Sequence, residues 1–447
     1  MPDPLTENQP ASAVPRPPRA GLQLIVAWLV LGAVVGVVCG AASAVFLLAL
    51  ARVTQFRDGH EVIVYGLPIA GVLVGFAYER FGRSIAGGNN LIIDTIHDDG
   101  PRLPLRMAPM VLVGTVLTHL FGGSAGREGT AVQMGASLAD AVLQRLKQSG
   151  SLRRQVLAAG VAGGFGSVFG TPIAGALFGL EFVVLGRIEY DALLPALIAS
   201  LLGDMTTRAL GVTHSHYPTP EALALSPLLL LKWVLFAAAL SLATRAFIGL
   251  THFLKKHGER RIPRLPLRMF AGGVAVVVLW RLVGTSNYLG LGVPTIMRSF
   301  TDPQLPHAAF ALKIVFTALT LGAGFLGGEV TPLFFVGATL GNALAQGLGL
   351  PLAMSAGVGL AAVFAAAANA PLALSVMAVE LLGGNLFPHA AIVCVLCYWM
   401  TGQRSIYMAQ RLLRGKDGRK LTRPTPLRDL GSRPPSDVDA IREEDLP

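Results

Sequence analysis

The sequence predicts an all-α membrane protein that crosses the bilayer many times. Its 447 residues are 53% hydrophobic and only 14% charged, and the mean hydropathy is +0.59. Residues 24–50 and residues 330–379 carry no charged side chain, and each run exceeds the about 20 residues that span a bilayer. Helices are the structures that satisfy their own backbone polar groups over such long apolar stretches.

The basic residues predict how the chain is oriented. The formal net charge is +10, but the Lys and Arg residues gather in short connections between apolar segments, at 145–154, 255–268 and 411–423. Positively charged loops stay on the cytoplasmic side of a membrane. We therefore expect these loops and both termini to be cytoplasmic, and we expect no nucleic-acid partner.

The composition divides the chain into one membrane domain and two tails. Residues 1–21 are polar and proline-rich, and residues 414–447 are charged and proline-rich. We predict that both tails are disordered and cytoplasmic, because they have little to bury and the second is too short for a folded regulatory domain. The transmembrane domain is predicted to span residues 22–413.

The apolar segments differ in length in a way that predicts discontinuous helices. Two are long, at residues 24–50 and 227–254. Several others are short and interrupted by Gly or Pro, and they lie at 131–143, 155–169, 172–186, 354–368 and 371–383. Short interrupted segments indicate helices that end inside the membrane, as in transporters. Such ends are tolerated where they line a cavity or are buried in protein.

Two motifs recur and predict two related halves, at about 22–210 and 225–413. The sequence "GASL" at 135–138 recurs as "GATL" at 337–340, an offset of 202, and each follows a glycine-rich turn that contains an acid. Further on, "TPIAGALFGLE" resembles "APLALSVMAVE", with Glu181 and Glu380 offset by 199. In transporters such halves commonly have inverted topology and meet around a site near the membrane midplane.

The stretch "GGSAGREGTAVQMG", residues 122–135, is the strongest candidate site. A helix that starts at about Glu128 points free N–H groups and the positive end of its dipole into the membrane interior, which favours an anion. The motif "GGEVTP" supplies a matching helix start in the second half, with Pro332 in the first turn. The motif "AGGNN" at 86–90 is a third candidate helix start.

Glu128 itself is predicted to be functional, because an acid inside a membrane is costly. When ionised, its carboxylate is an anion and can occupy the site, and when protonated it loses that attraction and swings away. The structural alternatives are a helix cap or an ion pair with Arg127, and the pair is disfavoured because adjacent side chains point in different directions. An enzyme would need a nucleophile or a metal-binding set, and the sequence has no such constellation. We expect no enzymatic activity, cofactor or metal.

These motifs resemble those of the CLC family of chloride channels and proton-coupled anion exchangers. The resemblance rests on "GSAGREGT…VQMG", on "GTPIAG…E" and "NAPLA…E", and on the late "RSIYMAQ". It implies a CLC-like fold with tilted, discontinuous helices in two inverted halves. It also implies a homodimer with a separate anion pathway in each subunit, placed in a bacterial cytoplasmic membrane.

Several departures from the family pattern resemble its bacterial fluoride/proton antiporter branch. Thr130 replaces a proline, and Gly87 stands where chloride-handling members have a serine. Glu329 and Thr331 replace an apolar pair, and Phe182 takes the place of an inner glutamate. The predicted function is the export of fluoride in exchange for protons. The alternative is a chloride channel or a chloride/proton exchanger on the same fold.

The resemblance and the helix starts together assign the site residues. Glu128 is the predicted proton-coupled gate and Glu329 a second proton site. Tyr407 is expected to close the inner end of the pathway, the alternative being a tyrosine at the membrane interface. Thr331 is expected to partner Glu329 or to cap a helix, and the two asparagines of "GNN" to donate to the ion or to cap the next helix. The predicted anion contacts are Gly87, Gly88, Asn89, Asn90, Gly126, Arg127, Gly129, Thr130, Val330, Thr331 and Tyr407.

The remaining polar residues receive structural interpretations. Glu181 and Glu380 lie near predicted helix ends and are expected to stabilise the fold. Lys313, alone in an apolar segment, is expected to extend its ammonium group to the membrane surface. His214 and His216 resemble a metal-binding pair, but they have no acidic neighbours in the sequence and are expected to lie on the surface.

Overall fold

The computed structural model describes residues 18–98, 100–147, 150–185, 190–416, 418 and 420–430. The first half contains the helices α1 (Pro18–Gly59), α2 (Leu67–Phe81), α3 (Asn89–Asp98), α4 (Met107–Leu120), α5 (Glu128–Arg145), α6 (Ser151–Phe169), α7 (Pro172–Glu181) and α8 (Leu193–Ala209). The second half contains α9 (Pro227–Arg261), α10 (Leu265–Val283), α11 (Val293–Arg298), α12 (Ala309–Gly322), α13 (Val330–Leu348), α14 (Leu352–Ala368), α15 (Pro371–Leu382) and α16 (Phe387–Thr401). Three short strands form a small sheet and are β1 (Val184–Leu185), β2 (Arg411–Arg414) and β3 (Lys420–Pro426). Short 3-10 helices lie at η1 (Glu61–Gly66), η2 (Arg83–Ile85), η3 (Tyr190–Ala192), η4 (Ser286–Tyr288), η5 (Gly384–Leu386) and η6 (Leu427–Asp429).

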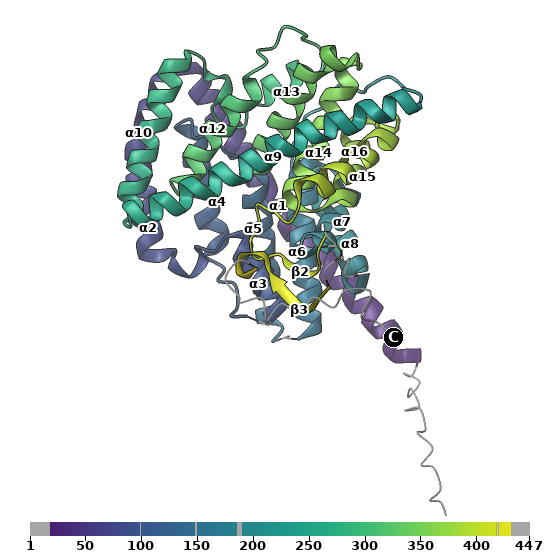
Figure 1. Ribbon diagram of the computed structural model, residues 1–447. Coiled ribbons are helices and arrows are strands. Elements are labelled where there is room, and N and C mark those ends of the chain that lie inside the picture. Colours follow the sequence, from purple (N-terminus) through teal and green to yellow (C-terminus); the bar gives the residue numbers. More distant parts are fainter. Residues whose placement is uncertain are drawn as a thin grey trace, which may run out of the picture.

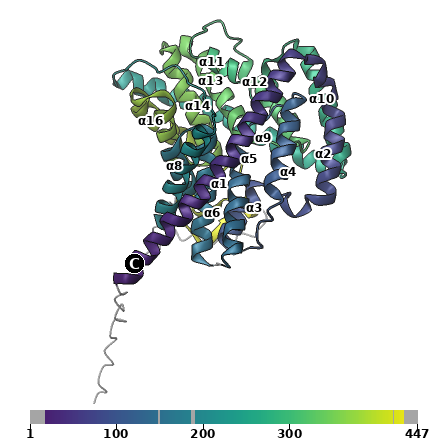
Figure 2. The ribbon, with the colours of Figure 1, turned by 180° about the vertical axis from the view of Figure 1, so that it is seen from behind.

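The helices have the mixture of lengths that the sequence predicts. The two long apolar segments lie in α1, of 42 residues, and α9, of 35 residues. Each runs on a slant across one face of the molecule, α9 in Figure 1 and α1 in Figure 2. Among the described residues, five segments are long and apolar enough to cross a membrane by length and composition, and they are Gln23–Gly59, Glu61–Phe81, Pro227–Arg261, Leu265–Val283 and Gly384–Thr401.

The order of helices in the first half repeats in the second. Each of the first eight helices has a counterpart of the same rank among the last eight. The "GASL" and "GATL" motifs both lie on the second of the two helices that flank a glycine-rich turn, α5 in one half and α13 in the other. The number and order of the described helices in the two halves agree with the repeat that the two motifs predict.

Glycines allow the closest helix pairs to pack backbone to backbone. A Cβ on Gly135 of α5 would lie 2.2 Å from the carbonyl oxygen of Gly160 on α6. In the second half, a Cβ on Gly337 of α13 would lie 2.0 Å from the carbonyl oxygen of Gly359 on α14. Small residues at such crossings are how membrane helices approach closely. The two halves therefore use the same packing at matching positions.

Glu181 and Glu380 join the halves, and their predicted structural role is consistent with these contacts. The carboxylate of Glu181, at the end of α7, accepts the N–H groups of Leu372 (3.2 Å) and Ala373 (2.8 Å) at the start of α15. The carboxylate of Glu380, on α15, accepts N–H groups at the start of α7, from Ile173 (3.0 Å) and Ala174 (2.8 Å). Each acid thus satisfies free donors at the helix start of the other half.

The prediction of a disordered second tail is wrong for the described residues up to 430. Strand β2 pairs parallel with β1 and antiparallel with β3; Figure 1 shows β2 and β3 in yellow near α3. Apolar residues among the charges explain the order, because Leu185, Leu412 and Leu427 form a small buried cluster. Helix α1 also begins at Pro18, before the predicted boundary. Residues 1–17 and 431–447, also predicted to be disordered, lie outside the described residues.

Candidate functional site

The first turns of α5 and α13 meet where the two halves contact each other. The N–H of Gly126 donates to the carbonyl oxygen of Gly328 at 2.6 Å, and the N–H of Gly328 donates back at 2.8 Å. Helix α5 then begins at Glu128, as predicted, and α13 begins at Val330. A helix start carries free N–H groups and partial positive charge. The glycine bridge therefore gathers two anion-attracting helix ends at one point.

The carboxylate of Glu128 occupies the start of the partner helix. Its side chain is 1% exposed, and one oxygen accepts the backbone N–H groups of Arg127 at 3.0 Å and Thr331 at 3.2 Å. The other oxygen accepts the Thr331 hydroxyl in a short hydrogen bond. A carboxylate bound by N–H groups at a helix start lies where an anion is favoured. Glu128 thus takes the place of an anion at α13.

Arg127 lies beside Glu128, and the expectation that the two side chains do not pair is wrong. Arg127 Nε is 3.6 Å from a Glu128 oxygen. The pairing is possible because Arg127 precedes the helix, with φ −112°, and is not bound by helical side-chain directions. Arg127 also lines a cavity of about 350 Å³, the outer cavity, together with the last third of α1 and Leu291. This cavity lies near the C-terminal end of α1.

A second cavity, the inner cavity of about 260 Å³, brings together seven of the predicted site residues. They are Gly87, Gly88, Asn89, Asn90, Thr130, Glu329 and Tyr407. Lys255, Glu259 and Arg268 also line it, and these belong to the basic connection at 255–268 that is predicted to be cytoplasmic. The other predicted residues, Gly126, Arg127, Gly129, Val330 and Thr331, form the two helix starts described above.

The two asparagines of the third helix start make different contacts. The side chain of Asn89 is buried, and its Oδ1 has no hydrogen-bond partner. The amide nitrogen of Asn89 approaches Gly129 so closely that a Cβ there would lie 3.1 Å away. Asn90 Oδ1 instead accepts the backbone N–H of Ala409 at 2.9 Å. Asn89 therefore lies closer to the helix starts, whereas Asn90 also holds the chain beyond Tyr407.

Two polar residues of α4 and α5 line the inner cavity without having been predicted as site residues. The hydroxyl of Thr115, on α4, lies 2.7 Å from the hydroxyl of Thr130, and both side chains are buried. Gln133, on α5, lines the same cavity near Gly88. Gln133 stands out as an amide in the otherwise apolar run "AVQMG", which is a usable sequence signal. Thr115 has no such signal, because threonine is common in apolar helices.

Glu329 precedes α13 and reaches the inner cavity. Its side chain lines the cavity together with Lys255. The predicted partnership of Glu329 with Thr331 is wrong, because the single hydroxyl proton of Thr331 is donated to Glu128. The reason is the approach of the two halves, which places Glu128 against the first turn of α13.

Tyr407 is buried in the protein, and the alternative of a tyrosine at the membrane interface is therefore wrong. Its side chain is 3% exposed, and its ring packs edge-on against that of Phe182 with 5.0 Å between centroids. Its backbone N–H donates to the Ser405 hydroxyl at 2.9 Å. Tyr407 and Ile406 together line the inner cavity.

Comparison with known proteins matches this architecture to one family. The family model of voltage-gated chloride channels, Voltage_CLC, matches residues 70–402. The chain belongs to the CLC family. It is 47% identical over 415 residues to the "Chloride/fluoride channel protein" of Pseudomonas syringae pv. tomato, which covers 92% of both chains. This family transports anions, so the chain is a CLC-type anion transporter of the membrane.

Solved CLC structures share the fold of this CLC protein. The crystal structure of a CLC-type fluoride/proton antiporter is 36% identical, with a TM-score of 0.84, and the match covers 87% of this chain and 98% of that one. A slow cyanobacterial Cl⁻/H⁺ antiporter, at 20% identity, has a TM-score of 0.73 over 84% of this chain and 94% of that one. The predicted all-α CLC fold and the resemblance to the fluoride/proton branch are thus confirmed.

Lys313 of this CLC protein does not reach the membrane surface, so that prediction is wrong. Its side chain is fully buried. The ammonium group donates to the carbonyl oxygens of Tyr288 at 3.1 Å and Gly290 at 2.7 Å, and it lies 5.2 Å from the centre of the Phe335 ring. Backbone carbonyls and an aromatic face let a buried cation remain inside the protein.

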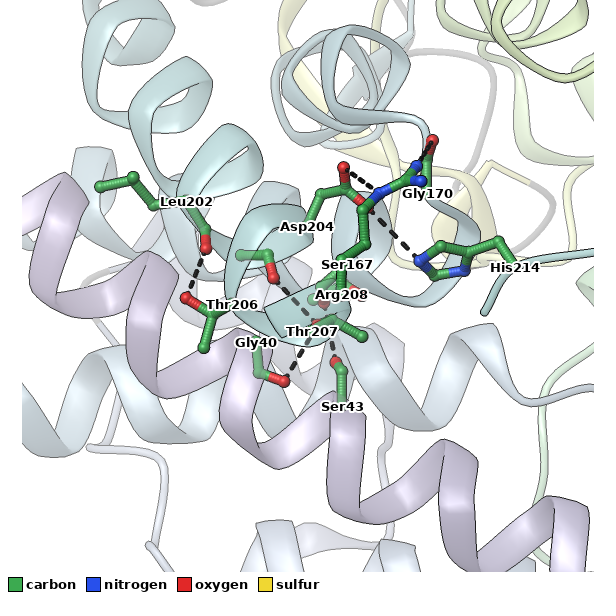
Figure 3. A network of polar contacts seen from close by, with 12 residues as sticks. Gly40, Ser43, Ser167, Gly170, Leu202, Asp204, Thr206, Thr207, Arg208 and His214 are labelled. Atoms are coloured by element: carbon green, nitrogen blue, oxygen red, sulfur yellow. Dashed lines mark hydrogen bonds and ion pairs between the residues drawn. The ribbon is translucent and has the colours of Figure 1, made fainter. Parts of the chain in front are cut away.

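His214 is likewise not a surface residue, whereas His216 is exposed. The side chain of His214 is 7% exposed, and its Nε2 lies 3.3 Å from an oxygen of Asp204 on α8. Arg208 donates to the same carboxylate at 2.9 Å and lies near the end of α6 at Gly170, as Figure 3 shows. The acidic neighbour of His214 is therefore Asp204, which lies ten residues earlier in the chain on α8.

Proposed function

We propose that this CLC protein exports fluoride in exchange for protons, and that the two ions compete at Glu128. One observation carries the proposal: the Glu128 carboxylate is bound by the N–H and hydroxyl of Thr331 at the start of α13. That position suits any small anion. A permeant anion and an ionised Glu128 therefore exclude each other from this position.

Protonation changes the competition in favour of the permeant ion. A neutral carboxyl group interacts more weakly with N–H donors and with helix dipoles than a carboxylate does. When Glu128 takes up a proton, it leaves the start of α13 and an anion enters. When the anion departs, Glu128 releases its proton and returns. If the anion enters from the inner cavity and leaves through the outer cavity, and the proton takes the reverse path, one cycle moves the two ions in opposite directions.

The two cavities supply the approaches to Glu128. Arg127 lines the outer cavity and is adjacent to the gate, while Thr130, two residues beyond the gate, lines the inner cavity. Glu329 offers a second proton site on the inner side, close to the cytoplasmic cation of Lys255. We assign the proton route to Glu329 and Glu128. The anion route follows the inner cavity between the "GNN" turn and Tyr407.

Three observations favour fluoride over chloride as the cargo. Gly87 lines the inner cavity without a hydroxyl, where chloride-handling family members are expected to have a serine. Amide and hydroxyl donors of Asn89, Thr115 and Thr130 line or face the same space. The chain also resembles proteins described as a chloride/fluoride channel and as a fluoride/proton antiporter. Selectivity then depends on how such donors replace the hydration shell of the ion.

The proposal also covers the membrane, the orientation of the chain and its oligomeric state. We place the chain in a bacterial cytoplasmic membrane, with the basic connections and both termini in the cytoplasm. We also propose a homodimer in which each subunit has its own pathway. Cross-linking of the purified protein in lipid nanodiscs, with mass determination, tests the dimer independently of transport.

The deciding experiment measures three fluxes from the same proteoliposomes. Purified protein is reconstituted with internal fluoride or chloride, and efflux is recorded with ion-selective electrodes while a pH dye reports proton uptake. We expect fast fluoride efflux, slow chloride efflux and proton uptake driven by the fluoride gradient. Equal rates for both ions would favour chloride/proton exchange, and fluoride efflux without proton uptake would favour a channel. Liposomes without protein provide the baseline.

A further inference from the structure

The chain after α16 builds one wall of the inner cavity. Residues 403–410, the inner loop, carry Tyr407, and residues 411–430, the C-terminal segment, follow directly. The segment consists of β2, β3 and η6 and returns to the membrane domain through the pairing of β2 with β1. Its sequence is charged and proline-rich, yet it folds against the part of the pathway assigned to the inner gate.

The end of the C-terminal segment is hydrogen-bonded to the backbone of the inner loop. The N–H of Leu427 donates to the carbonyl oxygen of Gln410 at 3.0 Å, and the N–H of Arg428 donates to that of Met408 at 3.0 Å. These acceptors come immediately after Tyr407. The segment therefore bonds to the loop one and three residues after Tyr407.

Buried hydrogen bonds of Gln410 and Ser405 connect these backbone contacts to Tyr407. The amide of Gln410 donates to the carbonyl oxygens of Phe182 (2.8 Å) and Ala368 (2.7 Å), at or just beyond the ends of α7 and α14. The Gln410 oxygen accepts the hydroxyl of Ser405 at 2.6 Å, and the Ser405 oxygen accepts the N–H of Tyr407. The inner loop is thus fixed to both halves of the protein.

The same segment also binds α3, which carries the "GNN" turn. The guanidinium of Arg428 donates to both oxygens of Asp94 on α3, at 2.9 and 3.0 Å. Asn90, at the start of α3, independently accepts the N–H of Ala409. Asn89 and Asn90 line the inner cavity. Asn90 therefore joins α3 to the inner loop directly, and Arg428 joins α3 to the C-terminal segment, which is itself bonded to the inner loop.

We propose that the Arg428–Asp94 ion pair is a clamp that sets the spacing between the "GNN" turn and Tyr407, and so controls how tightly the inner end of the pathway closes. Both residues are positioning residues, because they act through α3 and the inner loop. The pair is partly exposed, with side-chain exposures of 44% and 27%, so its strength is moderate. A moderate contact suits an element that must loosen during each cycle. This inference rests on the proposed function of Tyr407.

The test compares single charge removals with a charge exchange. The variants are Arg428→Gln, Asp94→Asn and the double variant Arg428→Asp with Asp94→Arg, each assayed as the full chain in proteoliposomes. The matched control is Arg423→Gln, on β3 of the same segment, because this exposed arginine has no ion pair within the described residues. The readouts are anion flux and the number of anions moved per proton.

We expect each single variant to move about two- to fivefold more anions per proton than the unmodified protein, in keeping with the loss of a partly exposed ion pair. The charge-exchanged variant restores the ratio toward its original value, and the Arg423 control leaves it unchanged. Thermal unfolding in detergent is measured in parallel, because a merely structural contact lowers stability without changing the ratio.

Two results would overturn the clamp. One is an unchanged flux and anion-to-proton ratio in both single variants. The other is a change that appears equally in the Arg423 control. The proposed function is decided separately by the unmodified protein. If it carries chloride, the same ratio is measured with chloride, and if it moves anions without protons, the variants are compared by anion flux, with the same expected twofold or larger change.

Discussion

The starts of α5 and α13 occupy matching places in the two halves but carry different chemistry. At an offset of 202, Arg127 corresponds to Glu329, and Glu128 corresponds to Val330. The backbones are alike, since Gly126 and Gly328 exchange hydrogen bonds and a helix follows each. The side chains differ, because the start of α5 carries the carboxylate of Glu128 and the start of α13 carries the donors of Thr331 that bind it.

Under the proposed function, this difference is what lets a symmetric scaffold support a directional cycle. If both helix starts carried the acid, two carboxylates would compete for the same donors and repel each other. If neither did, the helix starts would attract anions without any link to protons. With Glu128 on one side and the Thr331 donors on the other, one carboxylate is held by the opposite half. The acid at Glu329 is displaced by one position along the chain and faces the inner cavity instead.

The largest effect is expected from removing the acid of the first helix start. In Glu128→Gln the side chain keeps its size but can no longer take up or release a proton in the physiological range. Proton uptake driven by a fluoride gradient should fall to the level of liposomes without protein. The measurement is the paired fluoride and proton assay. The control is Glu221→Gln, an exposed glutamate between the halves.

Full coupling in Glu128→Gln would remove this residue as the site of competition. The comparison of the two helix starts would then lose its functional meaning, although the backbone symmetry would remain. A variant that conducts fluoride without protons sharpens the comparison, because it shows that the receiving helix start binds anions once the competing carboxylate is neutral.

Much of this arrangement was accessible from the sequence, for identifiable reasons. Motifs such as "GREGT" and "GGEVTP" predict helix starts because glycine, proline and an acid each have a local conformational role. The start of α5 at Glu128 follows from them directly. The meeting of the two starts was predicted only in outline, from the offset of the repeats and from the family resemblance.

Contacts between distant parts of the chain could not be read from local patterns. Thr331 donates to Glu128 across 203 positions, and Asp204 on α8 meets His214 in the connection that follows this helix. Lys313 has its partners in a turn more than twenty positions away. The charged, proline-rich composition around Leu427 led to the wrong prediction of disorder, because the segment is ordered by only a few buried leucines.

A smaller effect is expected from the acid next to the second helix start. Glu329→Gln removes a titratable group from the inner cavity but leaves Glu128 and its donors in place. Proton uptake per fluoride should fall several-fold, while fluoride efflux falls less, because the anion contacts remain. The paired flux assay measures both. Glu259→Gln is the matched control, since Glu259 lines the same cavity and is more exposed.

Unchanged coupling in Glu329→Gln would leave this acid with a structural role only. The comparison would then reduce to a single functional acid, and protons would have to reach Glu128 by another route through the inner cavity. A loss of fluoride efflux as large as the loss of proton uptake would point instead to a role in binding the anion.

The smallest effect on transport is expected where the two halves are chemically identical. Glu181 and Glu380 each accept two N–H groups at the helix start of the other half. Hydrogen bonds to a charged acceptor contribute about 1.5–3 kcal/mol, and glutamine keeps one acceptor oxygen, so each Glu→Gln variant should lose about 1–2 kcal/mol of stability. Thermal unfolding in detergent should show similar losses for both variants, with the fluoride-to-proton ratio unchanged. A change of that ratio in one variant alone would mean that the functional asymmetry of the helix starts extends to α7 and α15. Equal stability losses with an unchanged ratio would confine the functional asymmetry to the residues around Glu128 and Val330, where the two halves differ.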